Sequence, residues 1–159
     1  MNHSRKTGFH FGLTSGVITT MGLMVGLDSS TGSSAVVISG ILIIAITDAL
    51  SDAMGIHMSE ESEGKHSDKE IWEATLTTFC SKFIFALSFL IPIILFQLST
   101  AVTIGVVWGL LVIAVSTYNM AKNEGKKSPY KAVFEHLLIA IAVVVLTHYI
   151  GSWIRGVVG

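Results

Sequence analysis

The sequence predicts an all-α membrane protein with five transmembrane helices, and two observations indicate this. Hydrophobic residues make up 51% of the 159 residues and charged residues only 13%, about half of the roughly 25% found in soluble domains. The mean hydropathy is +0.68, and the charges are clustered, which leaves long stretches almost free of them. A soluble fold would lack charged side chains to cover its surface, so we expect a single transmembrane domain over residues 1–159.

Each predicted span is a segment close to the length of about 20 apolar residues that a membrane helix needs. In chain order the spans are Phe11–Leu27, Ser34–Met58, Thr78–Phe96, Val102–Thr117 and Ala132–Trp153. Short polar segments join the spans at Asp28–Ser33, Gln97–Ala101 and Asn119–Tyr130, and Pro129 fits the start of the fifth helix. Residues 59–75 are expected to form an acidic cytoplasmic loop.

The distribution of basic residues predicts the orientation. One side of the expected bundle receives Arg5, Lys6, Lys65, Lys69, Lys82, Lys122, Lys126, Lys127 and Lys131, and the other side only Arg155. Positive charge concentrates on the cytoplasmic side of membrane proteins. We therefore expect a cytoplasmic N-terminus, without a cleavable signal peptide, and a C-terminus outside.

Two aspartates stand out in the second span. Asp48 and Asp52 are four residues apart, so both project from one face of the helix. Two aspartates in mid-bilayer cost roughly 5–7 kcal/mol on insertion scales, and no basic residue is expected at matching depth. Proton binding or an exogenous cation therefore explains them best, and the two carboxylates should titrate as a coupled pair. The alternative is a pair of protonated carboxyls that hold helices together.

Further side chains are predicted to complete a cation path. Ser15, Thr19 and Met21 would contribute from the first helix, and an entrance would be formed by His57, Met58, Glu60, Glu61 and Glu63. Carboxylate, imidazole and thioether together suit a borderline transition metal better than calcium or magnesium. Simple packing of the methionines and a solvated acidic loop are the alternatives.

Glycines spaced four apart mark two helices as close-packing. Gly12 and Gly16, then Gly22 and Gly26, lie on the first helix, and Gly105 and Gly109 lie on the fourth. This spacing lets helix backbones approach closely in lipid. The contact could lie within one chain or between subunits, and the two repeats on the first helix favour a homodimer built around it.

Other classes of protein are disfavoured. The net charge is −1, without a basic stripe interleaved with aromatics, so nucleic acid is not an expected partner. The single cysteine, Cys80, excludes a disulfide within one chain and is expected to be a packing residue. No nucleophile–base pair, phosphate-binding glycine loop or hydrolytic zinc motif is present. We expect neither an enzyme nor a bound cofactor.

The order of segments resembles the vacuolar iron transporter family, which moves ferrous iron, and often manganese, out of the cytosol. GLTSGVITTMGLMVGL is similar to the family's Gly-x-Asn-Asp-Gly-x-x-Thr-Thr-x-x-x-x-x-Gly pattern, and ALSDAMGIHMSEES to its Ala-Leu-Ser-Met-Ala-x-Gly-Glu-Tyr-x-Ser-x-x-Ser signature. IWEATLTTFCSKFIFALSFLIPIILF resembles its third helix and LLIAIAVVVLTHYIG the start of its fifth. The resemblance implies five helices, a homodimer, and metal–proton exchange along the first two helices at the dimer interface.

The chain departs from the family at its functional positions. The family's first-helix aspartate falls on Ser15, its signature methionine on Asp52 and its signature glutamate on Ile56. A carboxylate has in effect moved from the first helix to the second, where Asp48 is one turn away. A dimer would then present four carboxylates around one axis. The family's long cytoplasmic insert is replaced by the short segment between Glu60 and Glu73.

These observations favour a homodimeric, proton-coupled exporter of divalent metal, ferrous iron first and manganese second. One alternative is a proton- or sodium-coupled transporter of another cation. Another is a membrane scaffold or metal sensor that does not transport. A prokaryotic cell membrane is the expected location, with a vacuole-like organelle as the alternative.

Overall fold

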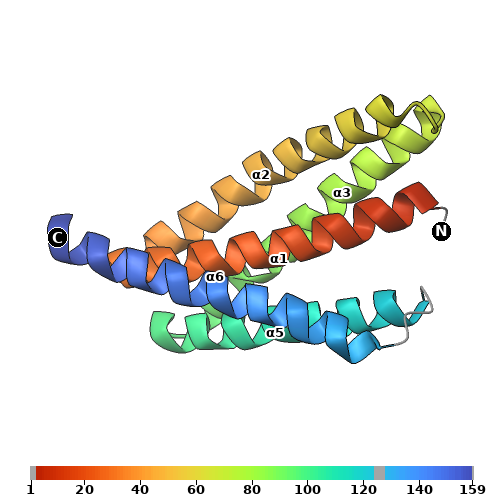
Figure 1. Cartoon of the computed structure of the whole chain (residues 1–159). Coiled ribbons are helices and arrows are strands. Elements are labelled where there is room, and N and C mark those ends of the chain that lie inside the picture. Colours follow the sequence, from red (N-terminus) through yellow and green to blue (C-terminus); the bar gives the residue numbers. More distant parts are fainter. Residues whose placement is uncertain (1–2, 124–127, 159) are drawn as a thin grey trace.

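The computed structural model describes residues 3–123 and 128–158. Within these residues there are six helices and no strand (Figure 1). The helices are α1 (His3–Thr31), α2 (Ser34–Glu63), α3 (Asp68–Ser88), α4 (Leu90–Leu95), α5 (Leu98–Asn123) and α6 (Pro129–Val158). Because α3 and α4 together form one candidate span, Asp68–Leu95, the described residues hold five helical units long and apolar enough to cross a membrane. The prediction of an all-α protein with five apolar helices is confirmed.

The helices extend beyond the predicted spans, and the predicted loop over residues 59–75 is wrong. The helix α2 continues to Glu63, where Gly64 ends it in the left-handed conformation (φ 63°) that favours glycine. Ser67 and Glu70 form a capping box that starts α3 only a few residues later. Helices thus cover most of this polar segment, and only residues 64–67 connect them.

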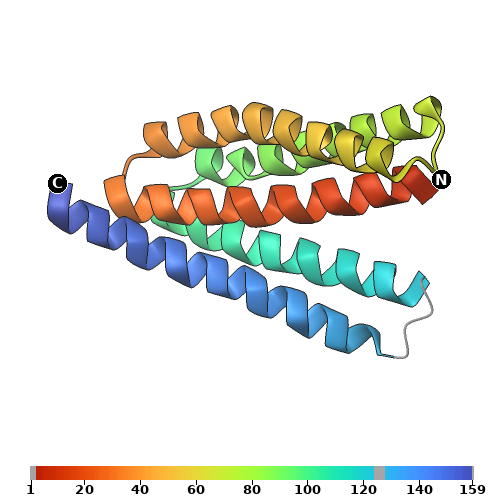
Figure 2. The ribbon, with the colours of Figure 1, turned by 45° about the horizontal axis from the view of Figure 1, so that its top comes forward.

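The bundle is arranged around α1. The helices α2 and α3 lie on one side of α1 and α5 and α6 on the other (Figures 1 and 2). Buried residues of α1, including Val17, Met21 and Met24, belong to a core that Phe89 and Ile113 also enter. A helix surrounded in this way is apolar on several faces, and here each face has a different neighbour.

The glycines of α1 bring it close to those neighbours within one chain. Gly12 and Gly16 face α3: a Cβ on Gly16 would lie 2.9 Å from Lys82 Cγ and 3.0 Å from the Lys82 carbonyl oxygen. On Gly22 it would lie 2.7 Å from Val143 Cγ1 of α6. The glycine repeats of α1 are therefore explained by intrachain packing, and they no longer favour a homodimer through the first helix.

The fourth-span repeat serves the same purpose. A Cβ on Gly105 would lie 2.6 Å from Met24 Cε, and one on Gly109 would lie 2.9 Å from Met21 Sδ. Because α5 lacks side chains at these two positions, the methionines of α1 fill the space.

The two ends of the bundle differ in the number of charged residues they hold, with most of them at the N-terminal end. One end of the bundle holds the N-terminus, the 64–67 connection, the C-terminal end of α5 and the N-terminal end of α6 (Figure 2). The C-terminus lies at the other end. Arg155 lies at the C-terminal end, where its guanidinium donates to the Asp28 carbonyl (2.7 Å) and the Ser30 carbonyl (3.3 Å). Basic side chains near a helix C-terminus satisfy its free carbonyls. Lys126 and Lys127, which contributed to the predicted orientation, lie outside the described residues.

Candidate cation and proton site

Four polar residues predicted to form a site lie together between α1 and α2. Asp48 and Asp52 project from one face of α2 because they are one turn apart, and Ser15 and Thr19 repeat that spacing on α1. Ser15 Oγ donates to Asp52 Oδ2 (2.7 Å), and Thr19 Oγ1 lies 3.0 Å from Asp48 Oδ2. The short connection between the two helices makes them antiparallel neighbours and brings the two pairs to the same level.

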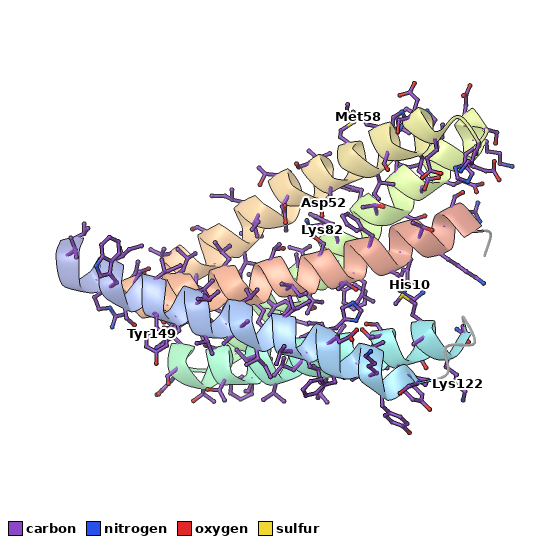
Figure 3. All side chains as sticks on the ribbon, viewed as in Figure 1. His10, Asp52, Met58, Lys82, Lys122 and Tyr149 are labelled. Carbon is purple, nitrogen blue, oxygen red and sulfur yellow. The ribbon has the colours of Figure 1, made fainter. Side chains whose placement is uncertain are left out.

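Lys82 of α3 completes this cluster, and the expectation that no basic residue reaches this depth was wrong. Its Nζ lies 2.6 Å from Asp48 Oδ2, forms an ion pair with Asp52 Oδ2, and donates to Ser15 Oγ at 3.0 Å. Figure 3 shows Asp52 and Lys82 side by side next to α1. We call Ser15, Thr19, Asp48, Asp52 and Lys82 the carboxylate–lysine cluster.

The error arose from counting Lys82 with the basic residues of the cytoplasmic side. The apolar segment of the sequence begins near Lys82, but α3 begins at Asp68. Lys82 therefore lies about 21 Å along the helix from its first residue. Lys82 is halfway along the span Asp68–Leu95. Lys82 lies within the mostly apolar sequence FCSKFIF. This flanking sequence, together with two aspartates that lacked a partner, could have predicted that Lys82 is buried.

The cluster lies at mid-depth in the bundle. Asp48 is close to the centre of Ser34–Glu63, and Ser15 and Thr19 flank the centre of Ser4–Thr31. Three helices thus bring their polar residues together at the level where a membrane is most apolar. Charged groups at such depth are rare and mark ion or proton pathways by default.

The cluster is not balanced in charge. In their ordinary ionised forms two carboxylates face one ammonium group, which leaves a formal charge of −1 in a region of low dielectric. All hydrogen bonds and ion pairs that the described residues make with the two carboxylates involve Oδ2. Each Oδ1 is therefore left to accept a proton or contact a cation.

Exposure differs within the cluster. The Lys82 side chain is 2% exposed, whereas those of Asp48 and Asp52 are 26% and 22% exposed. Neighbouring helices cover the Lys82 side chain, and α1 approaches it closely at Gly16. The carboxylates therefore form the accessible side of the cluster, and the ammonium group lies behind them.

The predicted sulfur and imidazole ligands lie elsewhere. Met21 is fully buried against α5. His57 Nδ1 lies 3.0 Å from Thr75 Oγ1, and its ring packs edge-on against Trp72. Met58 is exposed on the outer face of α2 (Figure 3). The cluster therefore offers oxygen ligands and one amine.

The predicted acidic entrance is divided among separate contacts. Glu60 is buried, with Oε2 2.8 Å from His66 Nδ1, while Glu63 lies 3.8 Å from Lys65 Nζ. Glu61 is exposed. Over the part of the chain that the structure describes, no group of three or more histidine, cysteine, aspartate or glutamate residues is placed to hold a metal ion.

Comparison with known proteins finds neither a matching family model nor a matching curated protein. The resemblance to vacuolar iron transporters stays a prediction.

Proposed function

We propose that the protein is a membrane transporter that exchanges a cation for protons at the carboxylate–lysine cluster. The observation that carries this proposal is the buried Lys82 ammonium, bound by two partly exposed carboxylates at mid-depth. A cation that enters from the exposed side competes with Lys82 for the same oxygens. Competition between a bound cation and exchangeable protons is the basic requirement of an exchanger.

The ligand chemistry supports a cation that prefers oxygen. Asp48, Asp52, Ser15 and Thr19 provide carboxylate and hydroxyl oxygens, and carboxylate ligands suit magnesium, calcium and manganese. Because Met21, His57 and Met58 lie outside the cluster, the argument for ferrous iron is weaker than the sequence implied. We place manganese(II) before ferrous iron as the transported ion, and export from the cytosol follows from the family resemblance.

Charge balance leads to a specific exchange ratio. With Lys82 protonated and one proton on a carboxyl group, the cluster is neutral. A divalent cation bound by both carboxylates leaves the cluster neutral again if both protons are released. Neutral states cost least in a medium of low dielectric, so we propose an exchange of two protons for one divalent cation.

The exposed side of the cluster supports a second copy of the chain as partner. Thr47, Ser51 and Gly55 are exposed on α2 beside the two aspartates. Lipid cannot satisfy carboxylate oxygens at mid-depth. We propose a homodimer in which α2, rather than α1, faces its counterpart, so that four carboxylates lie near the twofold axis.

A non-transporting scaffold is the second candidate, and the ion pairs themselves favour it. Lys82 could neutralise Asp48 and Asp52 permanently, which would make the cluster a structural tie among three helices. The scaffold predicts no cation-dependent release of protons. The exchanger predicts such release, and this difference separates the two functions.

Flux through purified protein in liposomes tests the proposal. Manganese(II) is added outside and a trapped dye reports internal pH, with Asp48→Asn and Asp52→Asn compared with Asp68→Asn, which removes a carboxylate outside the cluster. We expect manganese entry coupled to proton exit in the wild type and in Asp68→Asn, and its loss in both cluster variants. Equal flux in all four proteins would refute the site, and a sodium-driven pH change without a manganese response would move the proposal to the monovalent cation.

A further inference from the structure

A small cavity lies on the other side of α1 from the carboxylate–lysine cluster. It has a volume of about 220 Å³ and is lined by residues of α1, α5 and α6. The apolar residues Phe11 and Met120 line it together with the polar residues His10, Thr14, Ser116, Thr117 and His136. Figure 3 shows His10 on the side of α1 that faces α5, away from Asp52 and Lys82.

His136 provides the observation that points to a ligand. Its Nδ1 is buried and has no hydrogen-bond partner among the described residues. A buried polar atom without a partner is energetically unfavourable, so such atoms call for an explanation. A neutral imidazole is a common metal ligand, and His136 is one of the residues that line the cavity.

The other walls offer ligands of matching chemistry. His10 supplies a second imidazole and Met120 a thioether, while Thr14, Ser116 and Thr117 supply hydroxyls. A cavity of this size is small enough for side chains on opposite walls to reach a shared ion. Thioether and imidazole ligands together favour a soft or borderline transition metal over magnesium or calcium.

The charge of the lining selects the ion further. Among the described residues, no carboxylate or thiolate lines the cavity, so these ligands bring no negative charge to offset a cation. Burying an unpaired charge between membrane helices is costly, and the cost rises steeply with the charge. A neutral set of ligands therefore suits a singly charged ion better than a doubly charged one, and thioethers are among the ligands that select copper(I).

We infer that this cavity binds one soft, singly charged transition-metal ion of the copper(I) class, through the imidazoles of His10 and His136 and the thioether of Met120. The site is separate from the carboxylate–lysine cluster because α1 lies between them. Its ligands are soft and neutral, whereas those of the cluster are hard and charged. The two sites therefore select different ions.

The test is anaerobic competition for copper(I) between the purified full-length protein in detergent and a chromogenic copper(I) chelator. We expect one copper(I) per chain, with affinity lowered at least ~10-fold in His10→Ala, His136→Ala and Met120→Leu, because loss of an outer-shell partner alone costs about 10- to 100-fold. His66→Ala and Met58→Leu are matched controls that remove a histidine and a methionine elsewhere, and both should bind like the wild type.

Failure of the wild type to hold copper(I) against the chelator would overturn the inference, as would unchanged affinity in all three cavity variants. Should a variant fail to fold, X-ray absorption at the copper edge of the wild type decides. Nitrogen and sulfur scatterers together support the site, and a spectrum without sulfur contradicts it. Displacement of copper(I) by equimolar zinc(II) would contradict the selection by charge. Neither readout depends on transport, so the result is independent of the proposed exchange.

Discussion

Lys82 is the residue that changes the meaning of the two aspartates. From the sequence, Asp48 and Asp52 were unpaired carboxylates that called for protons or an external cation, and in the structure they pair with the Lys82 ammonium group of the chain itself. Their spacing and that of Ser15 and Thr19 could be predicted, because both follow from the helical repeat. The depth of Lys82 could not be read from the apolar segment alone, since it depends on where α3 begins.

Removing Lys82 should destabilise the protein strongly. Lys82→Met leaves the two partly exposed carboxylates with only their hydrogen bonds to Ser15 and Thr19, and breaking a buried ion pair costs about 3–5 kcal/mol. We expect a clear fall in the thermal midpoint in detergent, measured by circular dichroism, with partial recovery in Lys82→Met/Asp52→Asn. Lys122→Met, a change in the last turn of α5, serves as the control and should melt like the wild type. A Lys82→Met protein of unchanged midpoint would show that the pairing contributes little.

Ser15 should have a smaller effect, because its side chain carries no charge. Ser15→Ala removes the hydrogen bond donated to the Asp52 carboxylate and the one accepted from Lys82 Nζ, but leaves the ion pairs in place, and each bond to a charged group contributes about 1.5–3 kcal/mol. We expect a modest loss of stability and weaker binding of manganese(II), measured by calorimetric titration. Ser62→Ala, near the end of α2, is the matched control. Binding that is equally strong in Ser15→Ala and the wild type would remove Ser15 from the site.

At the scale of the helices, α1 is the element that positions the cluster. Its glycines allow α3 to approach closely enough for Lys82 to reach across to α2. The sequence predicted close packing from the glycine spacing, but spacing does not reveal the partner helix. Each face of α1 proved to have an intrachain neighbour, which only the arrangement of all five spans could show.

Adding a methyl group at this contact should separate the helices. A Cβ on Gly12 would overlap the carbonyl oxygen of Thr78, a backbone atom that cannot move aside, and overpacking typically costs about 1–3 kcal/mol. Gly12→Ala should therefore lower the thermal midpoint. Gly156→Ala is the same substitution on α6 where nothing lies within 4 Å, and it should be neutral or stabilising by about 0.5–1 kcal/mol. The reverse order of the two midpoints would contradict the packing described for α1.

At the scale of the whole molecule, composition was sufficient to predict a five-helix membrane protein because low charge and long apolar segments are global properties. The position of helix ends was less predictable. The helices end at caps such as Gly64 and Ser67, well past the ends of the predicted spans. With Lys82 removed from the basic residues of the N-terminal end, the charge asymmetry still favours a cytoplasmic N-terminus.

Labelling of single cysteines checks this orientation. In a Cys80→Ser background, Ser62→Cys lies near the 64–67 connection and Thr31→Cys lies at the opposite end of the bundle. A membrane-impermeant maleimide added to intact cells should label Thr31→Cys and spare Ser62→Cys until the membrane is opened. Labelling of Ser62→Cys alone in intact cells would reverse the orientation.

The ratio of protons to manganese(II) in liposomes is the most direct measurement of how the cluster works. We predict two protons released for each manganese ion taken up, at a rate that an imposed membrane potential does not change, because the cluster is neutral in both states. Manganese uptake without protons, or uptake driven by the potential, would contradict the exchange of a divalent cation for the protons of Lys82 and a carboxyl group.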